Sequence, residues 1–287
     1  MALPNYTETR YRIWHYSFLI ICASVFIFLI APLFVIIPLS FNAEQYIHFS
    51  KGMIALDPEA FSLRWYEDMI YGTKNPWGIA VRNSFYFAFC STIGATALGT
   101  LAALGLSSRH MPYKSLIMSI LISPMIIPLI ISGSAIFFSL AKVGLASSFI
   151  GVVMAHIILG TPFVVITVTA TLSGFDDSIT RAASSLGSTP TNTFFKITLP
   201  LILPGIISGA LFAFVTSFDE IVVILFVAGG ERSLTTIPLQ MWTGLREQLS
   251  PTIMAVATCL IVMSTFVLIA TELLRRRTER IRGITPR

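Results

Sequence analysis

Two adjacent carboxylates, Asp219 and Glu220, stand inside a long apolar stretch of the chain. Ionisable side chains are costly in a membrane span, and those that occur usually face a water-filled path or a charged partner. A small organic cation is one such partner, because carboxylates attract its charge and the rings of Phe218 or Trp242 can lie against it. The alternative is a structural role, as an ion pair with Arg232 or another subunit, or as a helix-end contact. The pattern therefore predicts either a cation pathway or a structural contact.

A second polar group occupies residues 173–202 and has the pattern of two short helices joined by a turn. Acidic residues and a serine precede the first helix, expected over residues 179–186, and Gly187 ends it because glycine tolerates a left-handed backbone. Thr189 and Pro190 form a cap and first-turn signature, which predicts a second helix over residues 190–196. We expect this segment to lie on the membrane surface.

Motifs of catalysis are missing from the sequence. It contains no H-E-x-x-H, no G-x-S-x-G and no G-x-x-x-x-G-K-S/T phosphate-binding loop. His156 is a lone histidine, which is more often packed than ligating, and the three cysteines, Cys22, Cys90 and Cys259, have no paired spacing. We therefore predict no catalytic residue and no metal site, and an intramembrane enzyme becomes a weak alternative.

The composition is that of an all-α integral membrane protein. Hydrophobic residues make up 55% of the chain, charged residues 11%, and the mean hydropathy is +0.81. Runs of about 20 apolar residues are long enough to cross a bilayer, and they must be helical because lipid leaves backbone groups unpaired. Six such spans are expected, over residues 14–41, 81–106, 115–140, 145–172, 203–228 and 252–274.

Lysine and arginine residues favour an orientation with both termini in the cytoplasm. The expected organisation is a cytoplasmic segment over residues 1–13, a six-helix transmembrane bundle over 14–274 and a basic cytoplasmic tail over 275–287. The net charge of +5 is concentrated beside a span, where it suits anionic lipid. Nucleic-acid binding is therefore discounted.

Helix contacts and bends are also indicated within the spans. Gly205 and Gly209 form a G-x-x-x-G pair, and small residues recur at Ala95, Gly99 and Ala103, as in helices that approach closely. Four prolines would bend helices that line or gate a passage, although static packing explains them equally well. They are Pro124, Pro128, Pro162 and Pro204.

The segments outside the bilayer carry interface aromatics. Ser62 is expected to cap a short helix with Trp65 at the membrane interface, in a loop that either covers the bundle or docks a partner. An amphipathic stretch over residues 239–249 carries Trp242 and is expected over the mouth of the bundle.

The polar segment resembles the EAA motif of ABC importer permeases, which reads E-A-A, three residues, G, nine residues, I-x-L-P. Arg181 stands where the motif has glutamate. Shorter stretches, Phe61–Tyr66, Asn83–Ser84 and Ser217–Glu220, resemble the spermidine/putrescine type of these permeases. The resemblance implies a type I importer permease fold and a role in ATPase coupling for Arg181, Ala182, Ala183, Ser184, Gly187, Ile197, Leu199 and Pro200.

The resemblance also implies the partners. They would be a second permease subunit, identical or homologous, two cytoplasmic ATPase subunits and a periplasmic substrate-binding protein, with the complex in the lipid of the bacterial inner membrane. This chain would bind no cofactor, and ATP and magnesium would be used by the ATPase. The expected cargo is a small organic cation such as a polyamine. Alternatives are an importer for another solute, such as an amino-acid derivative, an opine or iron, and an ion channel.

Overall fold

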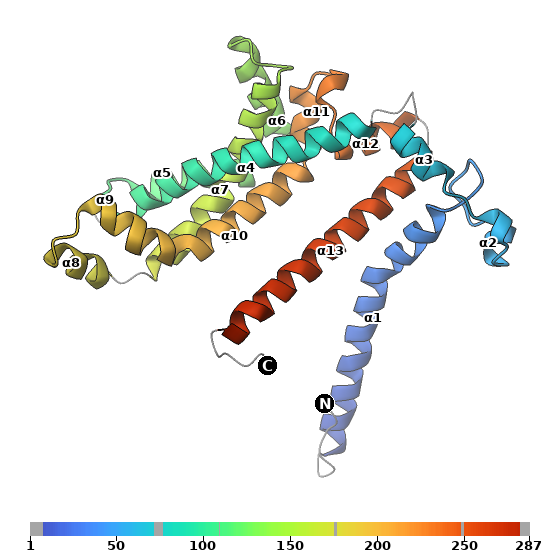
Figure 1. The fold of residues 1–287 in the computed structure, drawn as a ribbon, viewed down its shortest axis with the longest axis horizontal. Coiled ribbons are helices and arrows are strands. Elements are labelled where there is room, and N and C mark those ends of the chain that lie inside the picture. The colour runs from blue at the N-terminus through green and yellow to red at the C-terminus, as the bar shows by residue number, and fades with distance from the viewer. Residues whose placement is uncertain (1–7, 72–76, 109, 175–176, 248–249, 282–287) are drawn as a thin grey trace. The chain divides into compact units, whose positions relative to one another are not determined.

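The computed structural model describes residues 8–71, 77–108, 110–174, 177–247 and 250–281, and the regular elements in these ranges are helices (Figure 1). They fall into two units, one formed by the two ends of the chain and one by residues 76–243. The first unit contains α1 (Thr9–Leu39), α2 (Lys51–Ile54), η1 (Pro58–Ala60), α3 (Arg64–Tyr71) and α13 (Thr252–Ile281). The second contains α4 (Trp77–Ser107), α5 (Lys114–Ile126), α6 (Leu129–Lys142), α7 (Phe149–Ser173), α8 (Asp177–Ser185), α9 (Pro190–Thr193), η2 (Phe194–Thr198), α10 (Leu199–Phe218), α11 (Val222–Val227) and η3 (Arg232–Leu234), and α12 (Ile237–Glu247) begins in it.

The core of the second unit is the packing of α4, α7 and α10 against one another. Small residues form the contacts, as expected from their spacing. A Cβ atom on Gly209 would lie 2.8 Å from the Cα of Val164 in α7, and one on Gly99 of α4 would lie 2.6 Å from the Cβ of the same valine. Ala95 and Ala103 are fully buried in this core. The predicted stripes of small residues are therefore confirmed as helix contacts.

The expected span over residues 115–140 is two helices rather than one. α5 ends at Ile126 and α6 begins at Leu129, with an angle of 106° between them. Pro128, at the break, has no backbone N–H to donate, and it restricts the residue before it to extended conformations, which Ile127 adopts. A bend is confirmed at Pro128, and the expectation of one continuous helix is wrong.

The expected span over residues 203–228 is also interrupted. α10 begins earlier, at Leu199, and ends at Phe218, and the chain turns through Asp219–Ile221 before α11. Among the described residues, α1, α4, α7 and the helical stretch Pro190–Phe218 are long and apolar enough to cross a membrane. The bent pair α5 and α6 would make a fifth span, and the apolar part of α13, Thr252–Phe266, is shorter. The expected number of six spans therefore stays a prediction.

The first unit joins the loop after α1 to the start of α13. Ser62 caps α3 as predicted, because its Oγ accepts a hydrogen bond from the N–H of Arg64 (3.1 Å). Trp65, expected at the membrane interface, is buried: its Nε1 donates to the carbonyl of Asn42 (2.6 Å), and the Arg64 guanidinium lies 4.4 Å from its ring centre. The physical reason is that the indole N–H satisfies a loop carbonyl that would otherwise be unpaired.

The Asn83–Ser84 pair of α4 holds the segment after α11 in place. Asn83 Nδ2 donates to the carbonyls of Ser233 (2.7 Å) and Thr235 (2.9 Å), and Ser84 Oγ accepts from the N–H of Ile237 (2.8 Å). Asn83 is 4% exposed, so these bonds are shielded from water. The motif residues therefore fix the loop that leads into α12.

Replacing Asn83 with leucine should lower the thermal stability of the second unit. The change removes the donor from the buried carbonyl of Thr235 and from the partly buried carbonyl of Ser233 while keeping the side-chain volume, at a cost of about 1–3 kcal/mol. Thermal unfolding of the purified protein in detergent measures it. Ser119→Ala on α5, which removes an exposed hydroxyl bonded within its own helix, is the matched control. Equal unfolding temperatures for N83L and S119A would contradict the assignment.

Candidate functional site

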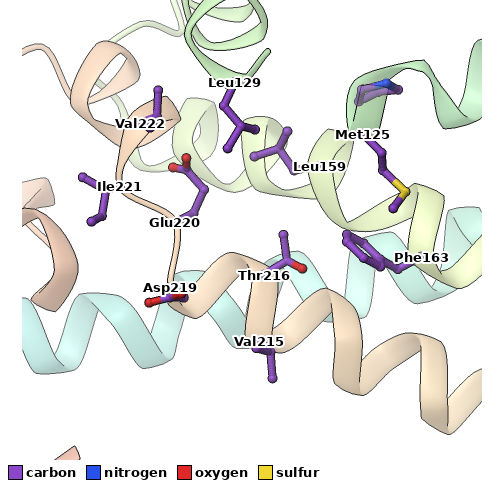
Figure 2. Close-up of a pocket in the computed structure, with 11 residues that line it drawn as sticks. Met125, Leu129, Leu159, Phe163, Val215, Thr216, Asp219, Glu220, Ile221 and Val222 are labelled. Atoms are coloured by element: carbon purple, nitrogen blue, oxygen red, sulfur yellow. The ribbon is translucent and has the colours of Figure 1, made fainter. Parts of the chain in front are cut away.

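A pocket of about 510 Å³ opens where α10 ends, within the second unit (Figure 2). The volume falls in the range of small-molecule sites. Its wall is mainly apolar, and its acidic members are Asp219 and Glu220. The lining residues are Pro124 and Met125 of α5, Leu129 of α6, Leu159 and Phe163 of α7, Val215 and Thr216 of α10, Asp219, Glu220 and Ile221 of the turn, and Val222.

The Glu220 carboxylate is occupied by the backbone of the next helix. Both of its oxygens accept from the N–H of Val223 (2.9 Å each), and Oε2 also accepts from the N–H of Ile224 (3.1 Å). The residue is 6% exposed, and Figure 2 shows its carboxylate turned toward the start of α11. Of the alternatives stated for this residue, the structure shows the helix-end contact. Glu220 stabilises the break between α10 and α11, where helix N–H groups would otherwise lack partners.

Asp219 is placed differently although it is the next residue along the chain. It is exposed, it lines the pocket, and among the described residues no hydrogen bond or ion pair reaches its carboxylate. Figure 2 shows its side chain pointing away from that of Glu220. The pair therefore divides into a buried helix cap and an exposed carboxylate at the edge of an apolar pocket.

The two aromatic residues predicted for the same pathway lie outside the pocket lining. Phe218 belongs to an aromatic row, with its ring centre 5.2 Å from that of Phe85 and 5.8 Å from that of Phe214. Trp242 lies on α12 and is 42% exposed. The ring that lines the pocket is instead Phe163 of α7. The break at Pro128, which brings α5 and α6 to the pocket, is the sequence signal that could have indicated Met125 and Leu129.

A buried polar network crosses the three core helices beside the pocket. Ser91 Oγ of α4 donates to Ser217 Oγ of α10 (2.9 Å), and Ser217 Oγ lies 2.6 Å from Nδ1 of His156 of α7. All three side chains are buried. The prediction that His156 is packed rather than metal-ligating agrees with this environment. The sequence analysis did not detect the network itself, although three polar residues in apolar helices were a visible signal.

The polar segment after α7 forms two helices and a turn, as predicted. Gly187 follows α8 with a φ of +83°, and Thr189 Oγ1 accepts from the N–H of Asn192 (3.4 Å) at the start of α9. A turn of π-helix, η2, then joins α9 to α10. The first helix begins two residues earlier than expected, at Asp177, and α9 proper is shorter than expected.

The residues predicted to couple this segment to an ATPase differ in exposure. Arg181, Ala182, Ser184, Gly187 and Pro200 are exposed, and Ile197 and Leu199 are half-buried. Ala183 is buried. Its carbonyl accepts from the N–H groups of Leu186 and Ser188 at the end of α8. Phe195 is 60% exposed, and Leu186 is 89% exposed.

Some of the predicted segments fall partly outside the described residues, among them the polar segment at residues 175–176 and the amphipathic stretch at residues 248–249. Residues 1–7 of the expected N-terminal segment lie outside them, as do residues 282–287 of the basic tail. The backbone of α13 continues to Ile281, while the tail arginine side chains are not described.

Comparison with known proteins supports the resemblance seen in the motif. Residues 95–280 match the family described as binding-protein-dependent transport system inner membrane component. The spermidine/putrescine transport system permease protein PotC of Haemophilus influenzae is 29% identical over 88% of this chain and 94% of its own. The putrescine transport system permease protein PotI of Escherichia coli K12 is 31% identical over 82% of both chains.

Solved structures agree on the fold. A chain of a bacterial ABC transporter involved in the import of the acidic polysaccharide alginate superposes with a TM-score of 0.71, at 15% identity, over 96% of this chain and 99% of that one. A chain of an amino acid ABC transporter gives 0.53 at 18% identity, over 75% and 96%. At such identities the likeness establishes the fold, and the prediction of an all-α importer permease fold is confirmed.

Proposed function

We propose, from the premise that the chain belongs to the family of binding-protein-dependent transport system inner membrane components, that it forms half of the pathway by which an importer carries polyamines across the inner membrane. As a member it is a membrane transport subunit and not an enzyme. ATP hydrolysis is assigned to two partner ATPase subunits. A periplasmic binding protein delivers the cargo, and a second permease subunit completes the pathway.

The observation that carries the cargo assignment is the exposed Asp219 carboxylate at the edge of an apolar pocket. A polyamine has ammonium groups separated by methylene chains. The carboxylate can pair with one ammonium, the ring of Phe163 offers a cation–π surface, and Met125, Leu129 and Leu159 can contact the methylenes. Relatives named as spermidine/putrescine and putrescine permeases support the same class of cargo.

Asp219→Asn should lower spermidine and putrescine uptake about tenfold in proteoliposomes that contain the whole importer, while the amount of assembled complex stays unchanged. The estimate is the loss of about one charge-assisted contact of 1.5–3 kcal/mol. Glu220→Gln is the contrasting variant. It should lower the unfolding temperature, because the amide oxygen accepts fewer hydrogen bonds than the three that the carboxylate accepts from the backbone.

Equal uptake by the wild-type and D219N importers would contradict a cation contact at this position. Amino acids and ferric iron, presented to the complete system as competitors, test the other cargo classes. Their failure to reduce polyamine uptake is the expected result.

Coupling to the ATPase is proposed for the segment α8–η2. The exposed Leu186 and Phe195 are apolar side chains without a covering element among the described residues, and contact with a protein surface would remove them from water. The positions Arg181, Ala182, Ala183, Ser184, Gly187, Ile197, Leu199 and Pro200 keep the role that the motif implies, with Ala183 acting from inside the segment.

A further inference from the structure

We propose that His156 is a positioning residue that fixes the end of α10, and with it Asp219, relative to the pocket wall on α7; this inference rests on the proposed function. His156 is 1% exposed and Ser217 is 5% exposed, and the bond between them joins α7 to α10 (2.6 Å). Nothing in the motif analysis assigns a role to this pair beyond packing.

Ser217 lies next to residues that line the pocket, so its bond to His156 can affect the shape of the pocket. It lies in the last turn of α10, between Thr216 and the turn that carries Asp219, both of which line the pocket. On α7, His156 is one helical turn before Leu159, another lining residue. A side-chain bond between α7 and α10 at this level therefore sets the distance between the two walls of the pocket.

The third member of the network extends the bond to α4. Ser91 Oγ donates to Ser217 Oγ (2.9 Å), and it is also within reach of the carbonyls of Phe87 (2.7 Å) and Ala88 (3.2 Å) in its own helix. Either the Ser217 hydroxyl donates to Nδ1 of His156, or Nδ1–H donates to the Ser217 oxygen, according to the histidine tautomer. The other ring nitrogen, Nε2, is buried and has no partner among the described residues. Nδ1 is therefore the atom that does the positioning.

Close packing around the network leaves His156 little freedom. A Cβ atom on Gly160, one turn along α7, would lie 3.1 Å from the Cβ of Ala213 in α10 and 3.3 Å from that of Ala95 in α4. The helices therefore meet directly beside the network, so the histidine cannot shift without moving a helix. Loss of the Nδ1 bond should release the end of α10 rather than let the ring adopt a new contact.

The test compares asparagine and glutamine at position 156. Asparagine places its side-chain oxygen near the position of Nδ1, whereas the longer glutamine side chain reaches toward the position of Nε2. In proteoliposomes with the complete importer and radiolabelled spermidine, His156→Asn should keep at least half of the wild-type ratio of spermidine carried to ATP hydrolysed. His156→Gln should lower that ratio about tenfold, the loss of one buried hydrogen bond at a positioned group.

A combined variant distinguishes positioning from a general loss of structure. If His156 acts through Asp219, H156Q should have little further effect in a D219N background, because the group it positions has already lost its charge. Independent losses that multiply would overturn the proposal. So would equal behaviour of H156N and H156Q, or retention of the ratio by glutamine and loss by asparagine, which would assign the role to Nε2.

Two further measurements keep the outcome interpretable. Should H156Q fail to accumulate, Ser217→Ala removes the partner hydroxyl with a smaller change in volume and should give the same lowered ratio. A D219N importer with wild-type uptake would refute the proposed cation contact itself. Lowered but measurable uptake by D219N, together with multiplicative losses for H156Q, would refute only the role of His156.

Discussion

Gly209→Leu is expected to prevent the second unit from packing. The glycine lies on the α7-facing side of α10, where an added Cβ would be 2.8 Å from the Cα of Val164 and closer still to Thr167 Oγ1. Backbone cannot move aside as a flexible side chain can, so the helices must separate along their whole contact. Overpacking of this kind costs about 3 kcal/mol or more. The measurement is the yield of monodisperse protein in detergent and its unfolding temperature.

Gly105→Leu on α4 is the matched control, because a Cβ there meets no atom within 4 Å. Both substitutions put the same side chain into an apolar helix, so any general effect of leucine on insertion is shared. We expect G105L to accumulate as the wild type does. Similar yields for G105L and G209L would show that α7 and α10 do not meet as the structure has them.

The helix contacts were the part of the fold that the sequence predicted best. Lipid removes the hydrophobic driving force between helices, so close approach depends on small residues, and these are visible as Gly205 and Gly209 or as Ala95 and Gly99. The positions of the helices followed from apolar length for the same reason. The pattern of small residues repeats every fourth position within one helix. It can therefore be recognised without knowing which helix is the partner.

The breaks between α5 and α6 and between α10 and α11 were harder to predict. They depend on contacts between residues distant in sequence or on the conformation of a single residue. Apolar composition continues through Ile127, and it resumes at Ile221 directly after two carboxylates, so average hydropathy indicated one span at each place where the chain has a break. Pro128 was recognised as a possible bend, but no sequence rule gives the 106° angle. The Glu220 carboxylate accepts hydrogen bonds from the N–H groups of Val223 and Ile224. These groups lack helix partners only because a new helix begins there.

Only part of the candidate site could be predicted from the sequence, for a related reason. Asp219 is conspicuous as a charge in an apolar stretch, whereas its apolar neighbours are ordinary residues of spans. Phe163 and Leu159 become lining residues only because α7 packs beside the end of α10. Phe218 and Trp242 were chosen as aromatic residues, and that property does not decide which ring faces a pocket formed by segments distant in sequence.

Gly187→Val is expected to uncouple ATP hydrolysis from uptake. The residue has a φ of +83° in the turn between α8 and α9, a conformation that a β-branched residue adopts only at a cost of about 1–3 kcal/mol. No atom lies within 4 Å of an added Cβ, so the whole cost comes from the backbone and none from a clash. The turn should relax, and the apolar contacts that α8 and η2 offer to an ATPase would then lose their relative position.

We expect the ratio of spermidine carried to ATP hydrolysed to fall at least fivefold in G187V, with the assembled complex still present, because a strain of 1 kcal/mol already corresponds to about that factor. Gly187→Asn should behave as the wild type, since asparagine tolerates the left-handed region. Gly144→Val separates coupling from strain in general: Gly144 has a φ of +73° and equally open surroundings, but it lies in the turn between α6 and α7. A similar loss of the ratio in G144V, or an unchanged ratio in G187V, would show that the α8–η2 segment does not transmit the work of the ATPase through the shape of its turn.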